Sequence, residues 1–256
     1  SLIRQIEACF GHKMGPGGMK KQEVIGGIVP NNSIMSSGPI AAWFYSRLEK
    51  SNYILIGDSQ SPMQSKFSIM REGLWKTPLG EIAIDRGLAE ALMDSSQLIQ
   101  YDAQPHETEY SIEVQIPFLQ YRFGDDFKIV PVLAFSKFAD DNFLDNCTEV
   151  GNAIARTIKR SGNDWKVIAS GQFNGLAKTK TVDELTKAVV KLDAGKFFDK
   201  IRKTKANVSG FGSMVVAITA ARKLGAKKGK LLKYAKASEV QPDIESSAGY
   251  ASIIIY

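Results

Sequence analysis

Short apolar runs alternate with longer segments of helical spacing along the chain. The apolar runs predict buried strands, and they cover 24–29, 53–56, 129–135, 167–169, 231–237 and 251–256. Apolar residues three or four positions apart predict helices between them, over 1–13, 38–50, 88–93, 111–121, 142–159 and 213–224. Strands that alternate with helices predict an α/β fold with a layered mixed β-sheet flanked by helices.

Local signals refine three of these boundaries. The alternation of polar and apolar residues over 81–85, after Thr77-Pro78-Leu79-Gly80, predicts a hairpin within 75–85. The sequence Thr-Val-Asp-Glu at 181–184 is a capping box and predicts a helix start, with a buried stripe that runs on to Ile201. Ser213 is the expected N-cap of the 213–224 helix, and Gly225 is its expected C-cap.

Length and composition favour one ordinary globular unit. The chain has 256 residues, of which 44% are hydrophobic and 23% are charged, a balance that excludes disorder. No linker rich in Pro, Gly and Ser divides it, so we expect a single domain over residues 1-256. No apolar run approaches the ~20 residues of a membrane helix, so no membrane insertion is expected. With only two cysteines, a disulfide scaffold is excluded and the cytoplasm is the expected compartment.

Charge is unevenly distributed along the chain. Residues 178–236 carry a net charge of +12, whereas the remainder carries −6. The densest basic stretch contains no acid and consists of Arg222, Lys223, Lys227, Lys228, Lys230, Lys233 and Lys236. Such a stretch can bind nucleic acid or another polyanion. A solvated lysine face is the favoured interpretation, because no aromatic residues stand between the lysines as stacking platforms.

Polar clusters follow the predicted strands, where open α/β folds place their ligands. The clusters lie at 31–33, 58–60, 106–113, 171–175 and 209–213. Three longer motifs accompany them: Trp-Lys-Thr-Pro-Leu-Gly-Glu at 75–81, Tyr-Ser-Ile-Glu-Val-Gln-Ile-Pro-Phe-Leu-Gln at 110–120 and Lys-Ile-Val-Pro-Val-Leu at 128–133. In this order, the clusters and the motifs together resemble the Memo family, also labelled protein B of the AmmeMemoRadiSam system. The resemblance covers nearly the whole chain and implies a fold like the catalytic subunit of class III extradiol dioxygenases.

The resemblance also implies a pocket in which two histidines and a cysteine occupy metal-ligand positions. Each matching position is changed here. The family has Pro-His-Ala-Gly-Tyr where this chain has Asn31 after Pro30, Gly-Pro-Asn-His where it has Gln60, and Cys-Gly where it has Ser209 before Gly210. Two further family motifs, Glu-His-Ser-Ile-Glu and Ser-Asp-Phe-Ser-His, have also changed. Their matching segments contain Tyr110 and, in the second, Gln172 and Asn174.

These replacements predict the loss of the family chemistry. Imidazole and thiolate bind zinc, iron and copper strongly, whereas amide and hydroxyl oxygens do not. The lost histidines would also have been the acid and base groups near neutral pH. We therefore expect no metal, no cofactor and no catalytic residue. The expected function is that of a pseudoenzyme, a binding or scaffold protein with a protein partner or a place in a larger assembly. The relic pocket is predicted to be lined by Asn31, Gln60, Tyr110, Gln172, Asn174 and Ser209.

An enzyme with a rewired site is the alternative. It would use His106, Glu109 and Glu113, with Asp58 as a further acid nearby. Glu109 and Glu113 are four residues apart and would share a helix face, although helix capping is the favoured role. For His106 we favour a helix-entry position, solvated or locally hydrogen-bonded. Cys9 and Cys147 match no family cysteine and are expected to be inert thiols.

Overall fold

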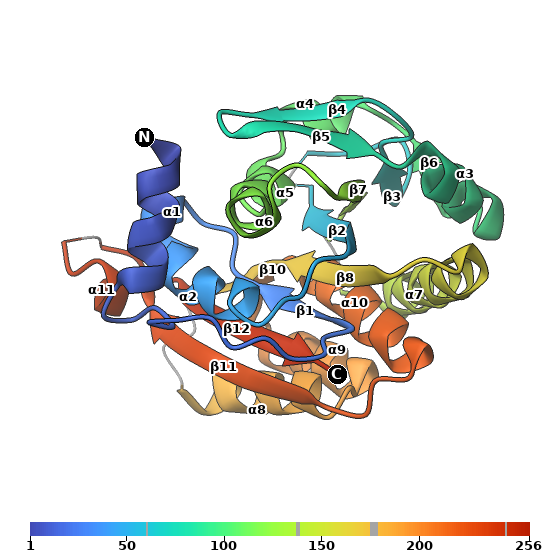
Figure 1. Ribbon diagram of the computed structural model, residues 1–256. Helices are drawn as coiled ribbons and strands as arrows, with labels where there is room; N and C mark the ends of the chain where they lie inside the picture. Colours follow the sequence, from blue (N-terminus) through green and yellow to red (C-terminus); the bar gives the residue numbers. More distant parts are fainter. Residues whose placement is uncertain (60, 137–138, 175–178, 244) are drawn as a thin grey trace.

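The computed structural model describes residues 1–59, 61–136, 139–174, 179–243 and 245–256. Figure 1 shows its helices and strands. The helices of the described residues are α1 (Leu2–Gly11), α2 (Ile34–Tyr45), α3 (Arg86–Ser95), α4 (Gln104–Thr108), α5 (Tyr110–Glu113), α6 (Ile116–Phe123), α7 (Asp141–Ser161), α8 (Thr179–Val190), α9 (Ala194–Thr204), α10 (Phe211–Leu224) and α11 (Ala237–Val240). The strands are β1 (Gly26–Val29), β2 (Asn52–Asp58), β3 (Phe67–Ile69), β4 (Leu74–Thr77), β5 (Gly80–Ile84), β6 (Ile99–Tyr101), β7 (Lys128–Ala134), β8 (Trp165–Ser170), β9 (Gln172–Asn174), β10 (Asn207–Ser209), β11 (Gly229–Lys236) and β12 (Gly249–Ile255).

One mixed sheet connects these strands, which confirms the predicted fold class. Its order is β10-β9-β12-β1-β8-β2-β7-β3-β6, with β11 beside β12, β5 beside β7 and β4 beside β5. The central strands β1, β8, β2 and β7 run parallel, whereas β12 and β3 join this group antiparallel. Because the four parallel strands end at the same edge, the polar loops after them gather there.

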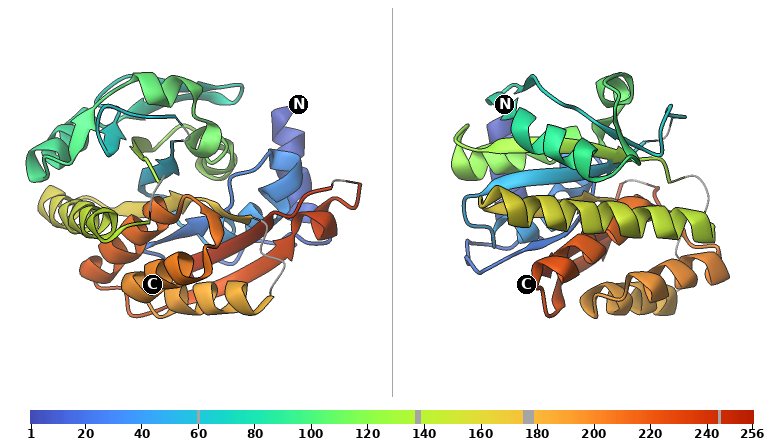
Figure 2. Two further views of the ribbon diagram at one scale, coloured as in Figure 1. Left: turned by 180° about the vertical axis from the view of Figure 1, so that it is seen from behind. Right: turned by 90° about the vertical axis from the view of Figure 1, so that its right-hand side faces the viewer.

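Helices cover both faces of the sheet, and each face has its own apolar core. On β2, Ile54 and Ile56 pack with α3, α7 and α10, whereas Tyr53 and Leu55 pack with α1, α2 and α6. Successive side chains of a strand point to opposite faces, so a run of apolar residues without alternation is what a strand between two layers requires. Figure 2 shows α7 running across one face, with α8 and α9 at one end of the molecule.

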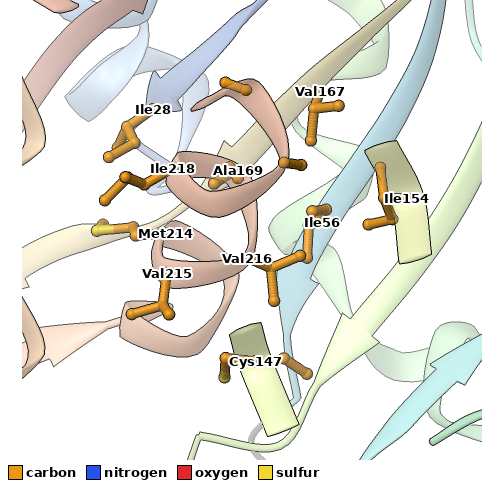
Figure 3. Close-up of a cluster of buried hydrophobic side chains, with 14 of the residues drawn as sticks. Ile28, Ile56, Cys147, Ile154, Val167, Ala169, Met214, Val215, Val216 and Ile218 are labelled. Atoms are coloured by element: carbon orange, nitrogen blue, oxygen red, sulfur yellow. The ribbon is translucent and has the colours of Figure 1, made fainter. Parts of the chain in front are cut away.

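Ten residues of helix α10 are buried, and most of them belong to the apolar core that contains Ile54 and Ile56. Its small and branched residues pack against α7, where Gly151 leaves room for Thr219. Figure 3 shows Cys147 of α7 among the aliphatic side chains of α10, including Val216. Burial raises the pKa of the Cys147 thiol, with a smaller contribution from the charge of Asp58. Burial also raises the pKa of Cys9 to about 12. Neither thiol is a thiolate near neutral pH.

Several predicted helix limits were wrong. Helix α2 begins at Ile34 rather than residue 38, and Pro39 lies inside it. Gly38 fits there because α1 approaches so closely that an added Cβ would lie 2.5 Å from Cys9 Sγ. The expected 111–121 helix is two short helices, α5 and α6. Helix α8 already begins at Thr179, so Thr181 cannot be its N-cap.

The predicted stripe that runs on to Ile201 is likewise divided between two helices, and Asp193 caps the second one, α9. Within the described part of the chain, no helix combines the length and the apolar character that crossing a membrane requires.

Candidate functional site

A buried hydrogen-bond network lies beneath the carboxyl ends of the central strands. Gln115 is at its centre: its Oε1 accepts from Tyr45 Oη at 2.7 Å, and its Nε2 donates to Pro30 O at 3.1 Å and to Ser170 Oγ at 2.8 Å. Ser170 Oγ in turn donates to Ser111 O at 2.6 Å. The network therefore ties the loop after β1, the end of β8 and helix α5 together, and it pairs the polar groups that folding removes from water.

Asp58, at the end of β2, continues the network towards α10. Its side chain is buried, and its Oδ2 accepts from Gly210 N at 3.0 Å. Gly210 has a φ of +73° and an added Cβ would lie 2.4 Å from Ser170 O, so the position requires glycine. Gly210 is also the N-cap residue of α10, and the prediction of Ser213 as N-cap was wrong. Ser213 Oγ instead donates to Gly57 O at 2.6 Å, which anchors α10 to β2.

The short antiparallel pair β9–β10 presents polar side chains above this network. Gln172 pairs with Ser209, and Asn174 pairs with Asn207. Residues opposite each other in an antiparallel pair point to the same side, so these four share one face. The intervening Phe173 is buried in the core. The polar face lines a cleft of about 690 Å³, together with Asp58 and Tyr110.

The other wall of the cleft carries basic side chains. Arg202 and Lys205, from the end of α9, line it together with Ser136. Arg202 forms ion pairs with Asp141 and Asp199. Lys205 has a φ of +52° and makes no ion pair with the residues that the structure describes. The cleft thus combines neutral hydrogen-bonding groups with at least one available positive charge.

The structure brings four of the six predicted pocket residues together. Tyr110, Gln172, Asn174 and Ser209 all line the cleft. Asn31 is buried and does not line it, and Gln60 lies outside the described residues. Sequence reasoning missed Arg202, Lys205 and Asn207. The polar-apolar-polar pattern of Asn-Val-Ser at 207–209 could have indicated Asn207, whereas the two basic residues gave no such signal.

The three residues of the rewired-enzyme alternative do not meet. Glu109 caps α5, because its Oε1 accepts from Ser111 N at 2.8 Å, whereas Glu113 is exposed at the last residue of that four-residue helix. The two acids therefore do not share a helix face. His106 stands at a helix entry as expected, in the first turn of α4, but its side chain is neither solvated nor locally bonded: it is buried, and its Nε2 lies 3.0 Å from Ser68 Oγ on β3. Burial lowers the pKa of His106 to about 4. None of the three lines the cleft.

The donor atoms at the family positions do not fit a transition metal. Asn31, Gln60 and Ser209 offer neutral oxygens, whereas the resemblance implies imidazole and thiolate at these positions. Asp58 supplies the one carboxylate in the cleft lining, and its Oδ2 is held by the Gly210 N–H. Across the described residues, no group of three His, Cys, Asp or Glu side chains is arranged to hold a metal ion. No step through a metal is therefore derived for this chain.

The densest basic stretch folds around the edge strand β11. Arg222 and Lys223 lie in the last turn of α10, and Lys227 and Lys228 follow the helix. The strand itself carries Lys230, Lys233 and Lys236. All but the half-buried Lys233 are exposed. Among the described strands β11 pairs only with β12, and its register shifts between Leu231 and Lys233. Lysines and a bulge on an edge strand prevent further strand pairing, which gives these residues a structural role.

Comparison with known proteins identifies the family. A family model described as "Memo-like protein" matches residues 1–254. A MEMO1 family protein of Methanosarcina mazei is 37% identical over 260 residues, which cover 100% of this chain and 93% of the relative. One from Pyrobaculum aerophilum is 34% identical over 267 residues, with the same coverage. The chain belongs to the Memo family.

A solved structure shows the same fold at low sequence identity. An uncharacterized protein of Escherichia coli K12 superposes with a TM-score of 0.54 at 12% identity, over 91% of this chain and 100% of that one. At this identity the likeness concerns the fold alone.

Proposed function

We propose that this chain is a binding or scaffold protein that has lost the metal chemistry implied by its resemblance to the family, a pseudoenzyme of the cytoplasm. One observation carries the proposal. The buried network of Gln115, Ser170 and Ser111 holds the cleft in shape, yet the polar side chains of its lining are amides, hydroxyls and basic groups, with Asp58 as the one carboxylate. The scaffold of a site is kept while its reactive positions are replaced.

The chemistry of the cleft favours binding over catalysis. A general base works best with a pKa near the operating pH. Amides do not titrate, and the Asp58 carboxylate is held by the Gly210 N–H. The same groups are good hydrogen-bond donors and acceptors. We infer that Gln172, Asn174 and Ser209 contact a polar ligand or a segment of a partner protein, with Lys205 available to a negative group.

Restoring the family residues tests this proposal. The triple variant Asn31→His/Gln60→His/Ser209→Cys regains the two imidazoles and the thiolate that the resemblance implies. We expect it to bind one equivalent of Zn(II) in calorimetric titration, whereas the unchanged chain binds none. Asn32→His/Ser61→His/Asn207→Cys places the same residue types one or two positions away and serves as the control. Stoichiometric Zn(II) binding by the unchanged chain would contradict the proposal.

Polyanion binding is a second candidate, and the groove between α8 and α9 favours it. The groove has a volume of about 480 Å³ and its lining includes five lysines: Lys187, Lys191, Lys196, Lys200 and Lys203. Lys196 pairs with Asp193, and Lys200 pairs with Glu184. The other three make no ion pair with described residues, so the groove keeps an excess of positive charge.

Salt dependence tests the second candidate. If the groove binds RNA or DNA, the affinity falls steeply with salt, and each phosphate contact adds about 0.9 to the logarithmic slope on duplex DNA. The variant Lys187→Glu/Lys191→Glu/Lys203→Glu should flatten that slope, whereas Lys230→Glu/Lys236→Glu on β11 should leave it unchanged. Binding that is indifferent to salt would exclude this function.

A further inference from the structure

The cleft at β9 and β10 carries polar side chains that the protein itself leaves unused. Gln172, Asn174, Asn207 and Ser209 share one face of the strand pair, and none of them forms a hydrogen bond with another described residue. Gln172 Oε1 is buried, so this residue presents its Nε2. Asparagine and serine side chains both donate and accept hydrogen bonds, as an alcohol does, so this face suits a ligand with several hydroxyl groups.

The two ends of this polar face differ in charge. Lys205 stands two residues before Asn207, is exposed, and makes no ion pair with the described residues. At the other end, Asp58 lines the cleft and accepts from Gly210 N, next to Ser209. A ligand anion is therefore attracted to the Lys205 end and repelled from the Asp58 end. From Asn207 to Ser209 the strand spans about 7 Å, which leaves room for one sugar ring between the two charges.

The basic wall of the cleft favours a phosphate over a carboxylate. A carboxylate is held best by the planar fork of a free arginine, whereas lysine binds phosphate as a point charge. Arg202, the arginine of this wall, is already paired with Asp141 and Asp199. Lys205 is held in the left-handed region at the end of α9, with a φ of +52°, where glycine is the usual residue. A strained lysine at the wall of a cleft is typical of a ligand-binding position.

We propose that this cleft binds a phosphorylated monosaccharide. The phosphate pairs with Lys205 at the Asn207 end, and the sugar hydroxyls bond to Asn174, Ser209 and Gln172. The cleft volume of about 690 Å³ lies within the range of small-molecule sites. The ligand belongs to the cleft already described and so rests on the proposed function, in which that cleft binds rather than catalyses.

Phosphorus NMR of the full chain with glucose 6-phosphate, fructose 6-phosphate and ribose 5-phosphate tests this proposal. We expect saturable binding of at least one of the three, with a Kd of about 1 mM or below. Inorganic phosphate should bind about tenfold more weakly, because it lacks the hydroxyl groups that the strand pair would hold. The proposal is overturned if none of the three sugars binds saturably, or if inorganic phosphate binds equally well, since the site would then be a lone lysine.

Two lysines at the end of α9 provide a matched pair of variants. Lys205→Gln should weaken binding of the sugar phosphate about tenfold, whereas Lys203→Gln, which makes the same change of charge outside the cleft lining, should leave it unchanged. Lys205→Gly removes the same charge and relaxes the left-handed backbone, so it should lose this affinity without losing thermal stability. Equal affinities of the Lys205→Gln and Lys203→Gln variants would overturn the proposal.

The same spectra separate the ligand class from the proposed function when each titration is run with and without EDTA and followed over time. Conversion of a bound sugar phosphate would contradict the proposed function and support the ligand class. Absence of binding under both conditions would overturn the ligand class alone. Binding that EDTA abolishes would overturn both, because a metal ion rather than Lys205 would then hold the phosphate.

Discussion

The buried network around Gln115 and the lining of the cleft at β9 and β10 lie within one site. They differ in whether their polar groups are hydrogen-bonded inside the protein or exposed in the cleft. In the network, Gln115, Ser170 and Ser111 bond to one another and to backbone groups of three separate elements. In the lining, Tyr110 is 53% exposed, and Gln172 and Asn174 stand on a short strand pair above the core. From this contrast we expect the stability of the fold to depend on the first set far more than on the second.

This contrast explains how a chain can keep its family fold while side chains of the cleft lining change. Replacing a buried, paired group leaves its partners unsatisfied, which costs about 1–3 kcal/mol for each group. Replacing a partly exposed lining residue typically changes stability by no more than about 0.5 kcal/mol. Side chains of the lining can therefore change without endangering the sheet.

The largest effect is expected at Gly210. Gly210→Ala forces a left-handed backbone on alanine and places its Cβ against Ser170 O, so we expect a loss of about 4 kcal/mol. Urea unfolding measures it. Gly162→Ala is the matched control, because Gly162 has a φ of +68° and nothing within 4 Å of an added Cβ. That variant should lose only about 1 kcal/mol. Equal losses would mean that the contact with Ser170 does not matter.

Gln115→Leu should have the next largest effect. It leaves the Tyr45 hydroxyl and the Pro30 carbonyl without their bonds in a buried site, so we expect a loss of about 3 kcal/mol in urea unfolding. The comparison variant is Gln172→Leu in the lining, with an expected change below about 0.5 kcal/mol. If both variants lost the same amount, the distinction between network and lining would fail.

His106 provides a test outside the cleft. Its pKa is lowered from 6.5 to about 4, so the unfolded chain takes up a proton in a range where the folded chain does not. Stability should therefore fall as the pH falls below about 6.5, by about 2 kcal/mol between pH 7 and pH 5. His106→Gln should reduce that pH dependence by this amount in urea unfolding. An unchanged pH profile would show that folding does not change the pKa of His106.

The smallest effect is expected at Asn174. Asn174→Ala removes an amide from the cleft lining and should change the free energy of unfolding by less than about 0.5 kcal/mol. Thermal unfolding checks it, with Asn207→Ala, directly opposite on β10, as a second lining variant. A loss comparable to that of Gln115→Leu would assign Asn174 to the buried network.

The sequence allowed the fold to be predicted well because the apolar pattern itself encodes it. Runs such as 129–135 have no alternation, which places their strands between two helical layers. The first and last residues of helices were less predictable where tertiary contacts decide them. Serine is a residue type favoured at helix N-caps, yet the hydroxyl of Ser213 donates to Gly57 O, 156 residues away in the chain. No local pattern carries that information.

The candidate site was predictable in part for the same reason. Gln172 and Asn174 follow a predicted strand, and the matching family motif singled them out together. Arg202 and Lys205 reach the cleft only because α9 ends beside β10, which depends on how the helix docks. His106 was misjudged because its partner Ser68 is on a strand 38 positions earlier.

The most direct test of the central claim is the metal content of the untagged protein. Elemental analysis should follow purification and separate additions of Fe(II), Cu(I) and Zn(II). Asn31, Gln60 and Ser209 supply neutral oxygens where the resemblance implies imidazole and thiolate, which predicts no stoichiometric metal in any sample. One tightly held metal ion per chain would contradict the account and would assign metal binding to donors other than the family's.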